Sequence, residues 1–161
     1  MALMRGGFVA LFAVLLCACA ASGGGNRSDA LAVVQTYLAA LASENREVAE
    51  ALFSANAEIV LPFHPSGDAG EAAIRRFTVP VYLGIAFQQY DNLVFVNQRA
   101  HLANAGATVF LEATGDLKVA RTGAPYRNRY LFRFDVYDGR IERIVEYSNP
   151  VTAARHGAAA Q

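Results

Sequence analysis

The 161-residue sequence has no tryptophan, only two cysteines and only 17% charged residues. Both cysteines, Cys17 and Cys19, lie near the start of the chain, so the remainder can form neither a disulfide framework nor a cysteine metal site. The formal net charge is zero, which argues against a nucleic-acid-binding protein because such proteins usually have a basic excess. Apolar residues make up 54% of the chain, which is enough for the core of one globular domain.

Sequence motifs for metals, cofactors and nucleophilic catalysis are also missing. The three histidines, His64, His101 and His156, are far apart, and no H-x-x-H or H-E-x-x-H spacing occurs. There is no Gly-x-Ser-x-Gly, no phosphate loop and no dinucleotide fingerprint. We therefore predict a protein that uses no metal and no cofactor.

The start of the chain has the pattern of an export signal. Arg5 precedes an apolar run, Phe8 to Leu16, that is too short to span a bilayer as a mature helix. The following Leu16-Cys17-Ala18-Cys19 resembles a bacterial lipoprotein box, which predicts a signal peptide at 1–18, lipid attachment at Cys19 and a glycine-rich tether at 19–26. Cleavage after Ala20, releasing a soluble protein, is the alternative. Both alternatives predict export, and the first predicts a cell-envelope lipoprotein facing the periplasm whose membrane contact is the lipid anchor only.

The rest of the chain has the element order of an α+β domain. Apolar periodicity predicts helices, alternation predicts strands, and Pro65 to Asp68 has the composition of a loop. A helical candidate at 72–87 is interrupted at Val79-Pro80. We predict one domain at 27–152 and a disordered tail at 153–161. The predicted helices are 30–43 and 46–53, and the predicted strands are 57–63, 92–102, 107–119 and the two strands of a hairpin within 126–150.

That hairpin, Tyr126 to Pro150, is the most informative stretch of the sequence. Two strands flank a predicted turn at Asp138-Gly139. Period-2 alternation gives the second strand a carboxylate, Glu146, between apolar neighbours. In the first strand the same alternation puts four aromatic side chains and one amide on one face and charged side chains on the other. The aromatic face consists of Tyr126, Asn128, Tyr130, Phe132 and Phe134.

Two groups of segments carry a resemblance to the nuclear transport factor 2-like superfamily. Residues 32–37, 51–53 and 70–77 look like the first half of ketosteroid isomerases. The hairpin, with its ending Glu146-Tyr147-Ser148-Asn149-Pro150, looks like snoaL-like polyketide cyclases and phenazine-biosynthesis A/B proteins. The resemblance implies a cone, in which a curved antiparallel sheet and three helices enclose a pocket.

The resemblance also implies roles for individual residues. Tyr37 matches the isomerase tyrosine that donates a hydrogen bond to the developing oxyanion. Leu61 stands where the isomerase has its aspartate base, so the resemblance does not extend to steroid isomerisation. Glu146 matches an acidic residue that faces the ligand in the phenazine-like branch. A histidine of that branch corresponds to Glu71 here, with His64 nearby in the sequence.

Each candidate also has a structural interpretation. Glu146 is either a pocket acid with a raised pKa or a carboxylate paired with an arginine such as Arg99 or Arg129. Tyr37 is either an oxyanion donor or a core aromatic residue whose hydroxyl has a partner. Asn128 is either a ligand contact or the hydrogen-bond partner of a buried group.

We therefore expect an exported domain that binds a small hydrophobic or aromatic molecule. Its predicted ligand-binding residues are Asn128, Tyr130, Phe132 and His64, and its predicted catalytic residues are Glu146 and Tyr37. If the protein is an enzyme, its chemistry is cofactor-independent acid/base catalysis such as isomerisation, cyclisation or hydration, with Glu146 as the proton carrier. The alternative is a non-catalytic module that binds a ligand or a protein partner, with a homodimer through the exposed sheet face as one form.

Overall fold

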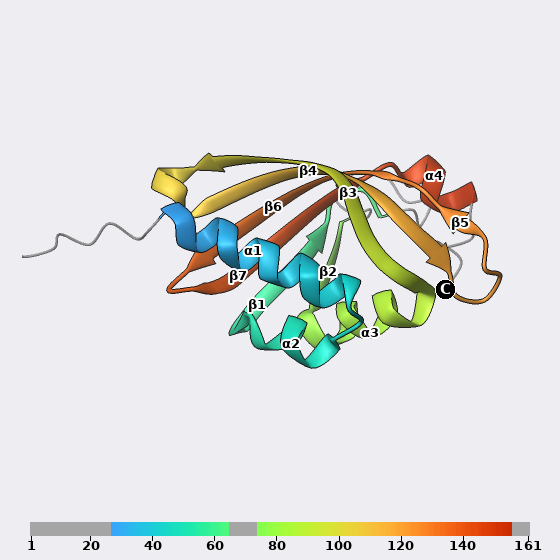
Figure 1. Ribbon diagram of the computed structural model, residues 1–161, viewed down its shortest axis with the longest axis horizontal. Helices are drawn as coiled ribbons and strands as arrows, with labels where there is room; N and C mark the ends of the chain where they lie inside the picture. The colour runs from blue at the N-terminus through green and yellow to red at the C-terminus, as the bar shows by residue number, and fades with distance from the viewer. Residues whose placement is uncertain (1–26, 65–73, 156–161) are drawn as a thin grey trace, which may run out of the picture.

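The computed structural model describes residues 27–64 and 74–155. Figure 1 shows a curved sheet with α1 lying along one face, α2 and α3 at one margin and α4 at the end near β5. The elements in order are α1 (Arg27–Ala42), α2 (Arg46–Ala51), β1 (Phe53–Leu61), β2 (Arg75–Thr78), α3 (Val79–Gln89), β3 (Tyr90–Ala103), the 3₁₀ helix η2 (Asn104–Gly106), β4 (Thr108–Val119), β5 (Pro125–Tyr126), β6 (Arg129–Tyr137), β7 (Arg140–Ser148) and α4 (Pro150–Arg155).

The seven-stranded sheet has the order β2-β1-β7-β6-β4-β3, with β5 paired to β4. The predicted α+β class and the curved sheet are confirmed. The sheet differs from the predicted antiparallel sheet at one place, where β1 runs parallel to its neighbour β7. The described residues also form four α-helices rather than the predicted three. A parallel pair of strands is possible here because the chain between them is long and contains the other strands.

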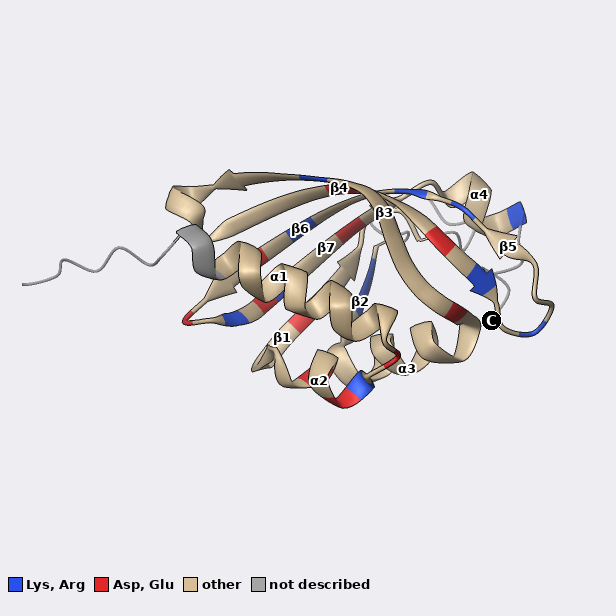
Figure 2. Ribbon diagram, in the orientation of Figure 1, with Lys and Arg blue, Asp and Glu red and all other residues tan. Residues whose placement is uncertain are grey.

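The core lies between α1 and the sheet. The predicted apolar face of α1 is confirmed, since Val34, Tyr37, Leu38 and Leu41 are all buried. Figure 2 shows that the described side chains of α1 and all of α3 lack charge, whereas acidic and basic residues occur on the strands and on α2. Both helices that face the interior therefore add apolar surface without a charge to desolvate.

The segment predicted as an interrupted helix at 72–87 has a different structure. Its described part contains strand β2, which ends at Thr78, and helix α3 starts at the next residue. Pro80 lies in the first turn of α3, where its missing N–H leaves no hydrogen bond unmade. The Arg46 side chain donates to the Pro80 carbonyl at 3.0 Å and so links α2 to this turn. Pro80 therefore marks the start of a helix and not a break within one.

The hairpin of β6 and β7 agrees with the sequence. Asp138 and Gly139 both have positive φ values, of 48° and 69°, as a two-residue turn between twisted strands requires. The register places Phe132 directly opposite Glu146. The turn and a one-residue register shift between Val136 and Asp135 together determine which residue lies beside the predicted acid.

The chain end differs from the predicted disordered tail at 153–161. Residues 153–155 belong to α4, and Ala153 is only 6% exposed. The side-chain oxygen of Asn149 accepts a hydrogen bond from the Val151 amide at 3.0 Å, which caps the start of this helix. The fold thus extends past residue 152, and 156–161 lie outside the described residues.

The predicted signal peptide, Cys19, the tether and Glu71 also lie outside the described residues. Within the described ranges, none of the helices has the length and hydropathy needed to cross a membrane.

Candidate functional site

A pocket of about 330 Å³ lies between α3 and the inner face of the sheet. Aromatic and aliphatic side chains make up most of its wall. Among the described residues that line it, none is a lysine, an arginine or an aspartate. Its ionisable groups are Glu146, His64 and the tyrosines Tyr82, Tyr90, Tyr126 and Tyr130.

Glu146 on β7 is the carboxylate of this pocket. It is 8% exposed, and the Tyr82 hydroxyl donates a hydrogen bond to its Oε2 atom. Burial raises the pKa of Glu146, and hydrogen bonds from Tyr82 and Ser148 oppose that rise. The alternative in which Glu146 pairs with Arg99 or Arg129 is wrong, because the described ion pairs do not include Glu146. The carboxyl group therefore faces a largely apolar cavity, and the ion pairs among the described residues do not include it.

Tyr37 lies in the core behind this pocket. Its ring packs edge-on against Phe53, at 5.4 Å between centroids, and against Phe134 at 5.9 Å. Burial, and secondarily the charge of Glu146, raise the pKa of Tyr37. Tyr37 is not among the described residues that line the pocket. Its packing fits the core interpretation, and its catalytic role stays a prediction.

Tyr130 and Phe132 form an aromatic stack on β6. Their rings are nearly parallel, with centroids 5.2 Å apart, and Phe95 from β3 packs edge-on against both at 5.3 Å. Tyr130 and Phe95 line the pocket, whereas Phe132 is buried and supports Tyr130 from the side. The stack thus holds one predicted ligand-binding residue at the wall and the other behind it.

Asn128 also lies behind the wall. Its Nδ2 atom donates to the Tyr126 hydroxyl at 3.0 Å and to the Asn149 carbonyl at 3.1 Å. Its Oδ1 atom accepts from the amides of Arg129 at 2.8 Å and Asn149 at 3.3 Å. These bonds agree with the structural interpretation of Asn128 as the partner of buried groups. A direct ligand contact is disfavoured, because both ends of the amide are occupied.

His64 lies three residues after the end of β1 and lines the pocket, and its ligand-binding role stays a prediction. Its ring lies 6.5 Å from that of Phe77. Leu61 is also part of the wall, so the position that corresponds to the isomerase base faces the same cavity as Glu146.

Sequence reasoning missed Tyr82, Tyr90 and Tyr126 as pocket residues. Tyr82 is the most important omission because it is the hydrogen-bond partner of Glu146. A signal for it was present, since Pro80 in the first turn of a helix would have placed Tyr82 on the turn beside β2. Burial raises the pKa of Tyr82, and the charge of Glu146 adds to that rise, so both partners favour their neutral forms.

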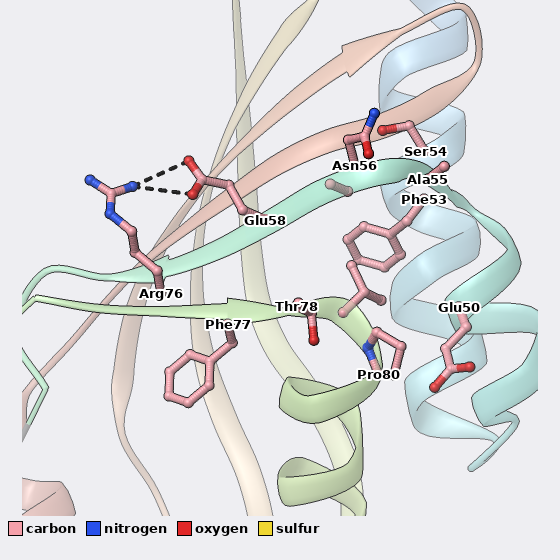
Figure 3. Close-up of a pocket in the computed structure, with 12 residues that line it drawn as sticks. Glu50, Phe53, Ser54, Ala55, Asn56, Glu58, Arg76, Phe77, Thr78 and Pro80 are labelled. Carbon is pink, nitrogen blue, oxygen red and sulfur yellow. Dashed lines mark hydrogen bonds and ion pairs between the residues drawn. The ribbon is translucent and has the colours of Figure 1, made fainter.

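A second hollow, of about 660 Å³, lies between β1, β2 and the start of α3. Figure 3 shows Ser54 and Asn56 on β1 at one end, Pro80 at the start of α3 and an ion pair between Arg76 and Glu58. The side chains of Arg76 and Glu58 are 57% and 40% exposed. The charged groups of this hollow are therefore solvated, whereas Glu146 in the first pocket is buried. We regard the Glu146 pocket as the candidate site.

No group of three or more potential metal ligands of the His, Cys, Asp and Glu types occurs within residues 27–64 and 74–155. The pocket can instead exchange a proton through Glu146 and bind apolar surface along its aromatic wall.

A curved sheet closed by helices around such a pocket defines the nuclear transport factor 2-like class of proteins. Within that class the SnoaL-like domain model matches residues 34–144, and the chain belongs to this family. The matched segment contains Tyr37, Tyr82 and Tyr130 and ends just before Glu146. None of the curated proteins matches the chain.

Several solved structures are similar to this one. A candidate isomerase from Bacillus subtilis superimposes with a TM-score of 0.67 at 23% identity, covering 84% of this chain and 95% of that chain. A phenazine biosynthesis-related protein from Pseudomonas aeruginosa gives 0.65 at 18% identity, with 80% and 84% covered. A candidate polyketide cyclase from Xanthomonas campestris pv. campestris gives 0.62 at 19%, with 84% and 97% covered. At these identities the similarity establishes the fold alone.

Proposed function

We propose that the Glu146 pocket binds a small hydrophobic or aromatic molecule and that Glu146 moves a proton on this molecule without a cofactor. The observation that carries the proposal is a buried carboxyl group on the wall of an apolar pocket, with a raised pKa and without an ion-pair partner in the described structure. A raised pKa brings a carboxyl group closer to the pH range in which general acids and bases act.

Tyr82 supports this role by holding the carboxyl group. Its hydroxyl donates to Oε2, and a carboxylate retains further acceptor positions for a second partner. The ligand's C–H or O–H group would occupy one of these positions. Isomerisation, cyclisation and hydration all need a proton to be removed and returned at such a group. The candidate isomerase and the candidate polyketide cyclase that share the fold are named for reactions of this kind.

A direct test uses 2-tetralone, an aromatic ketone with exchangeable α-hydrogens. Deuterium uptake at these positions in D₂O is followed by NMR with wild-type protein and with Glu146→Gln. We expect wild type to accelerate exchange above buffer and Glu146→Gln to abolish the acceleration while still binding the ketone. Glu142→Gln, an exposed change on the same strand, should behave as wild type.

Equal exchange with wild type and Glu146→Gln would contradict the catalytic part of the proposal. Mass spectrometry of small molecules captured by the two purified proteins would then decide whether the pocket is a binding site only. Equal retention of captured ligands by both would also remove Glu146 from the binding role.

The second candidate function is interaction with a protein, as a homodimer through the outer sheet face. It is favoured by three partly exposed apolar side chains, Phe63 at 57%, Leu131 at 37% and Tyr147 at 36%. Leu131 lies opposite Tyr147 in the register, and the Tyr147 ring lies 6.0 Å from that of Phe63. Sedimentation of wild type and Leu131→Asp tests this candidate, and two monomeric proteins would exclude it.

We also propose that the protein is exported to the cell envelope and anchored through a lipid on Cys19. The support is the apolar run at Phe8 to Leu16 followed by the lipoprotein-like sequence. Mass spectrometry of the mature N-terminus tests this. An acylated Cys19 is expected, and an unmodified residue after position 19 would exclude the anchor.

A further inference from the structure

Phe77 on β2 is the residue that the two hollows have in common. It lines both the Glu146 pocket and the second hollow, and no other described residue lines both. β2 is the edge strand of the sheet, and the Phe77 side chain on it is half-buried. The two hollows therefore meet at one aromatic side chain.

The Phe77 ring lies on the inner side of the sheet. Its register partner on β1 is Ile59, whose side chain is fully buried in the core. Because directly paired residues of adjacent strands point to the same face, Phe77 shares the inner face with Ile59. Figure 3 agrees, since the Phe77 ring and the ion pair of Arg76 with Glu58 lie on opposite sides of β2. The ring is thus directed toward α3 and away from the outer face.

Two residues of the Glu146 pocket pack against the Phe77 ring. The Tyr82 ring on α3 lies 6.2 Å away between centroids, and the His64 ring lies 6.5 Å away. Both distances are within the range of aromatic contacts. Tyr82 also donates the hydrogen bond to Glu146. Phe77 therefore lies next to the residue that holds the carboxyl group, at the side of the pocket that meets the second hollow.

The space available to a ligand depends on this wall. The Glu146 pocket, of about 330 Å³, lies near the lower limit of the range of about 300–1,000 Å³ that is typical of small-molecule sites. The second hollow is twice as large, at about 660 Å³, and its wall includes the buried apolar side chains of Phe53, Ala57 and Val79. Without the Phe77 ring, an apolar group of a ligand would gain apolar surface to cover there.

We propose that Phe77 is a specificity-determining residue that ends the Glu146 pocket and restricts it to compact molecules of about two fused rings. A ligand with an extended apolar chain would have to displace the Phe77 ring from Tyr82 and His64 or leave its chain in water. Such molecules are therefore selected against. This inference rests on the proposed function, since it names the ligand class of the same pocket.

Three ketones test the restriction, namely 2-tetralone, 6-propyl-2-tetralone and 6-hexyl-2-tetralone. Calorimetry gives their affinities for wild type, Phe77→Ala and Val81→Ala. In wild type the affinity should not rise with chain length. In Phe77→Ala it should rise by about twofold to fourfold for each CH₂ group that becomes buried. Val81→Ala, the matched control, shortens an exposed side chain of α3 that lines neither hollow and should behave as wild type.

The position of the chain is measured separately. Nuclear Overhauser contacts between the propyl group of bound 6-propyl-2-tetralone and the Val79 methyl groups report on the second hollow, because Val79 lines only that hollow. These contacts should appear in Phe77→Ala and be absent in wild type. If Phe77→Ala does not fold, Phe77→Leu replaces it, since leucine keeps the site apolar and should give the same changes to a smaller extent.

Three results would overturn the inference. The first is the same dependence of affinity on chain length in wild type and Phe77→Ala. The second is contact between the propyl group and Val79 in wild type, which would mean that the ring does not close the pocket. The third is an equal fall in affinity for all three ketones in Phe77→Ala, which would mean that Phe77 only supports the fold. If 2-tetralone does not bind wild type, the proposed function itself fails and the inference falls with it.

Discussion

Tyr82 and Glu146 are 64 positions apart in the sequence and are joined by a hydrogen bond inside the pocket. Tyr82 comes from α3, which covers the cavity, and Glu146 comes from the end of β7. The bond therefore ties the helix over the pocket to the sheet beneath it. It also joins a carboxyl group to a phenol, and burial raises the pKa of each.

Replacing Tyr82 with phenylalanine should raise the pKa of Glu146 further. Burial of Glu146 already raises this pKa, and the hydrogen bond from Tyr82 is the largest influence in the opposite direction. The variant should also lose about 1–3 kcal/mol in its free energy of unfolding at neutral pH, since it removes a hydrogen bond to a carboxylate. NMR titration of the Glu146 carboxyl carbon measures the first effect, and urea unfolding measures the second. Tyr137→Phe, at a hydroxyl that is mostly exposed, should change neither.

The free energy of unfolding should depend on pH through Glu146. Its pKa in the folded state is above its ordinary value of 4.5, so the native protein holds this proton more tightly than the unfolded chain. The resulting stability is fully present below pH 4.5 and is lost as the pH rises through the folded-state pKa. Glu146→Gln cannot lose a proton, so its stability relative to wild type should increase over this range.

Urea unfolding of wild type and Glu146→Gln between pH 4 and pH 8 measures this difference. Glu142→Gln, on the solvent side of the same strand, is the matched control and should show no comparable rise. A difference between wild type and Glu146→Gln that stays constant with pH, or shrinks as the pH rises, would mean that burial does not control the titration of Glu146.

Gly115 on β4 should not tolerate alanine. A Cβ atom there would lie 2.6 Å from Cδ1 of Leu117 and 2.9 Å from Cε2 of Tyr130, which are both closer than such atoms approach. The variant should lose about 1–3 kcal/mol in its free energy of unfolding, as overpacked cores do. If the Tyr130 ring gives way, binding of 2-tetralone should also weaken. Unchanged ligand affinity together with reduced stability would show that Leu117 moves instead. Ala113→Gly, at a buried position two residues earlier on the strand, serves as the control for a change of backbone freedom.

The sequence predicted the hairpin of β6 and β7 well because its signals are local. Alternation placed Phe132 and Glu146 on the inner face, and Asp138-Gly139 has the residues that a tight turn needs. The apolar spacing of α1 likewise predicted its buried face. These features depend on neighbours a few positions away, which a single sequence displays.

The partners of Glu146 could not be predicted in the same way. Its bond to Tyr82 depends on how α3 lies over the sheet, and the parallel pairing of β1 with β7 depends on the path of the whole chain. The position of Asn128 behind the wall has a similar cause. Alternation placed Asn128 on the inner face. Its side-chain amide is bonded to the backbone carbonyl and N–H of Asn149, which are 21 positions away and reach it only in the folded chain.

The parallel pairing of β1 and β7 leads to a last prediction, at Leu61. Val60 is the register partner of Val145, so the next residues along, Leu61 and Glu146, are neighbours on adjacent strands, about 4.8 Å apart across the sheet. Leu61→Asp would place a second carboxyl group beside the first, at the position that corresponds to the isomerase base. Two carboxylates this close cannot both ionise easily, so the pair should release its protons in two separate steps, the second at a higher pH than wild-type Glu146. NMR titration of the carboxyl carbons detects the two steps.

Leu61→Asn controls for the loss of apolar packing, because asparagine has the shape of aspartate and is polar but has no carboxyl proton to release. If the titration of Glu146 is the same in Leu61→Asp, Leu61→Asn and wild type, the two side chains do not share the pocket, and the position of the isomerase base is separate from the Glu146 site.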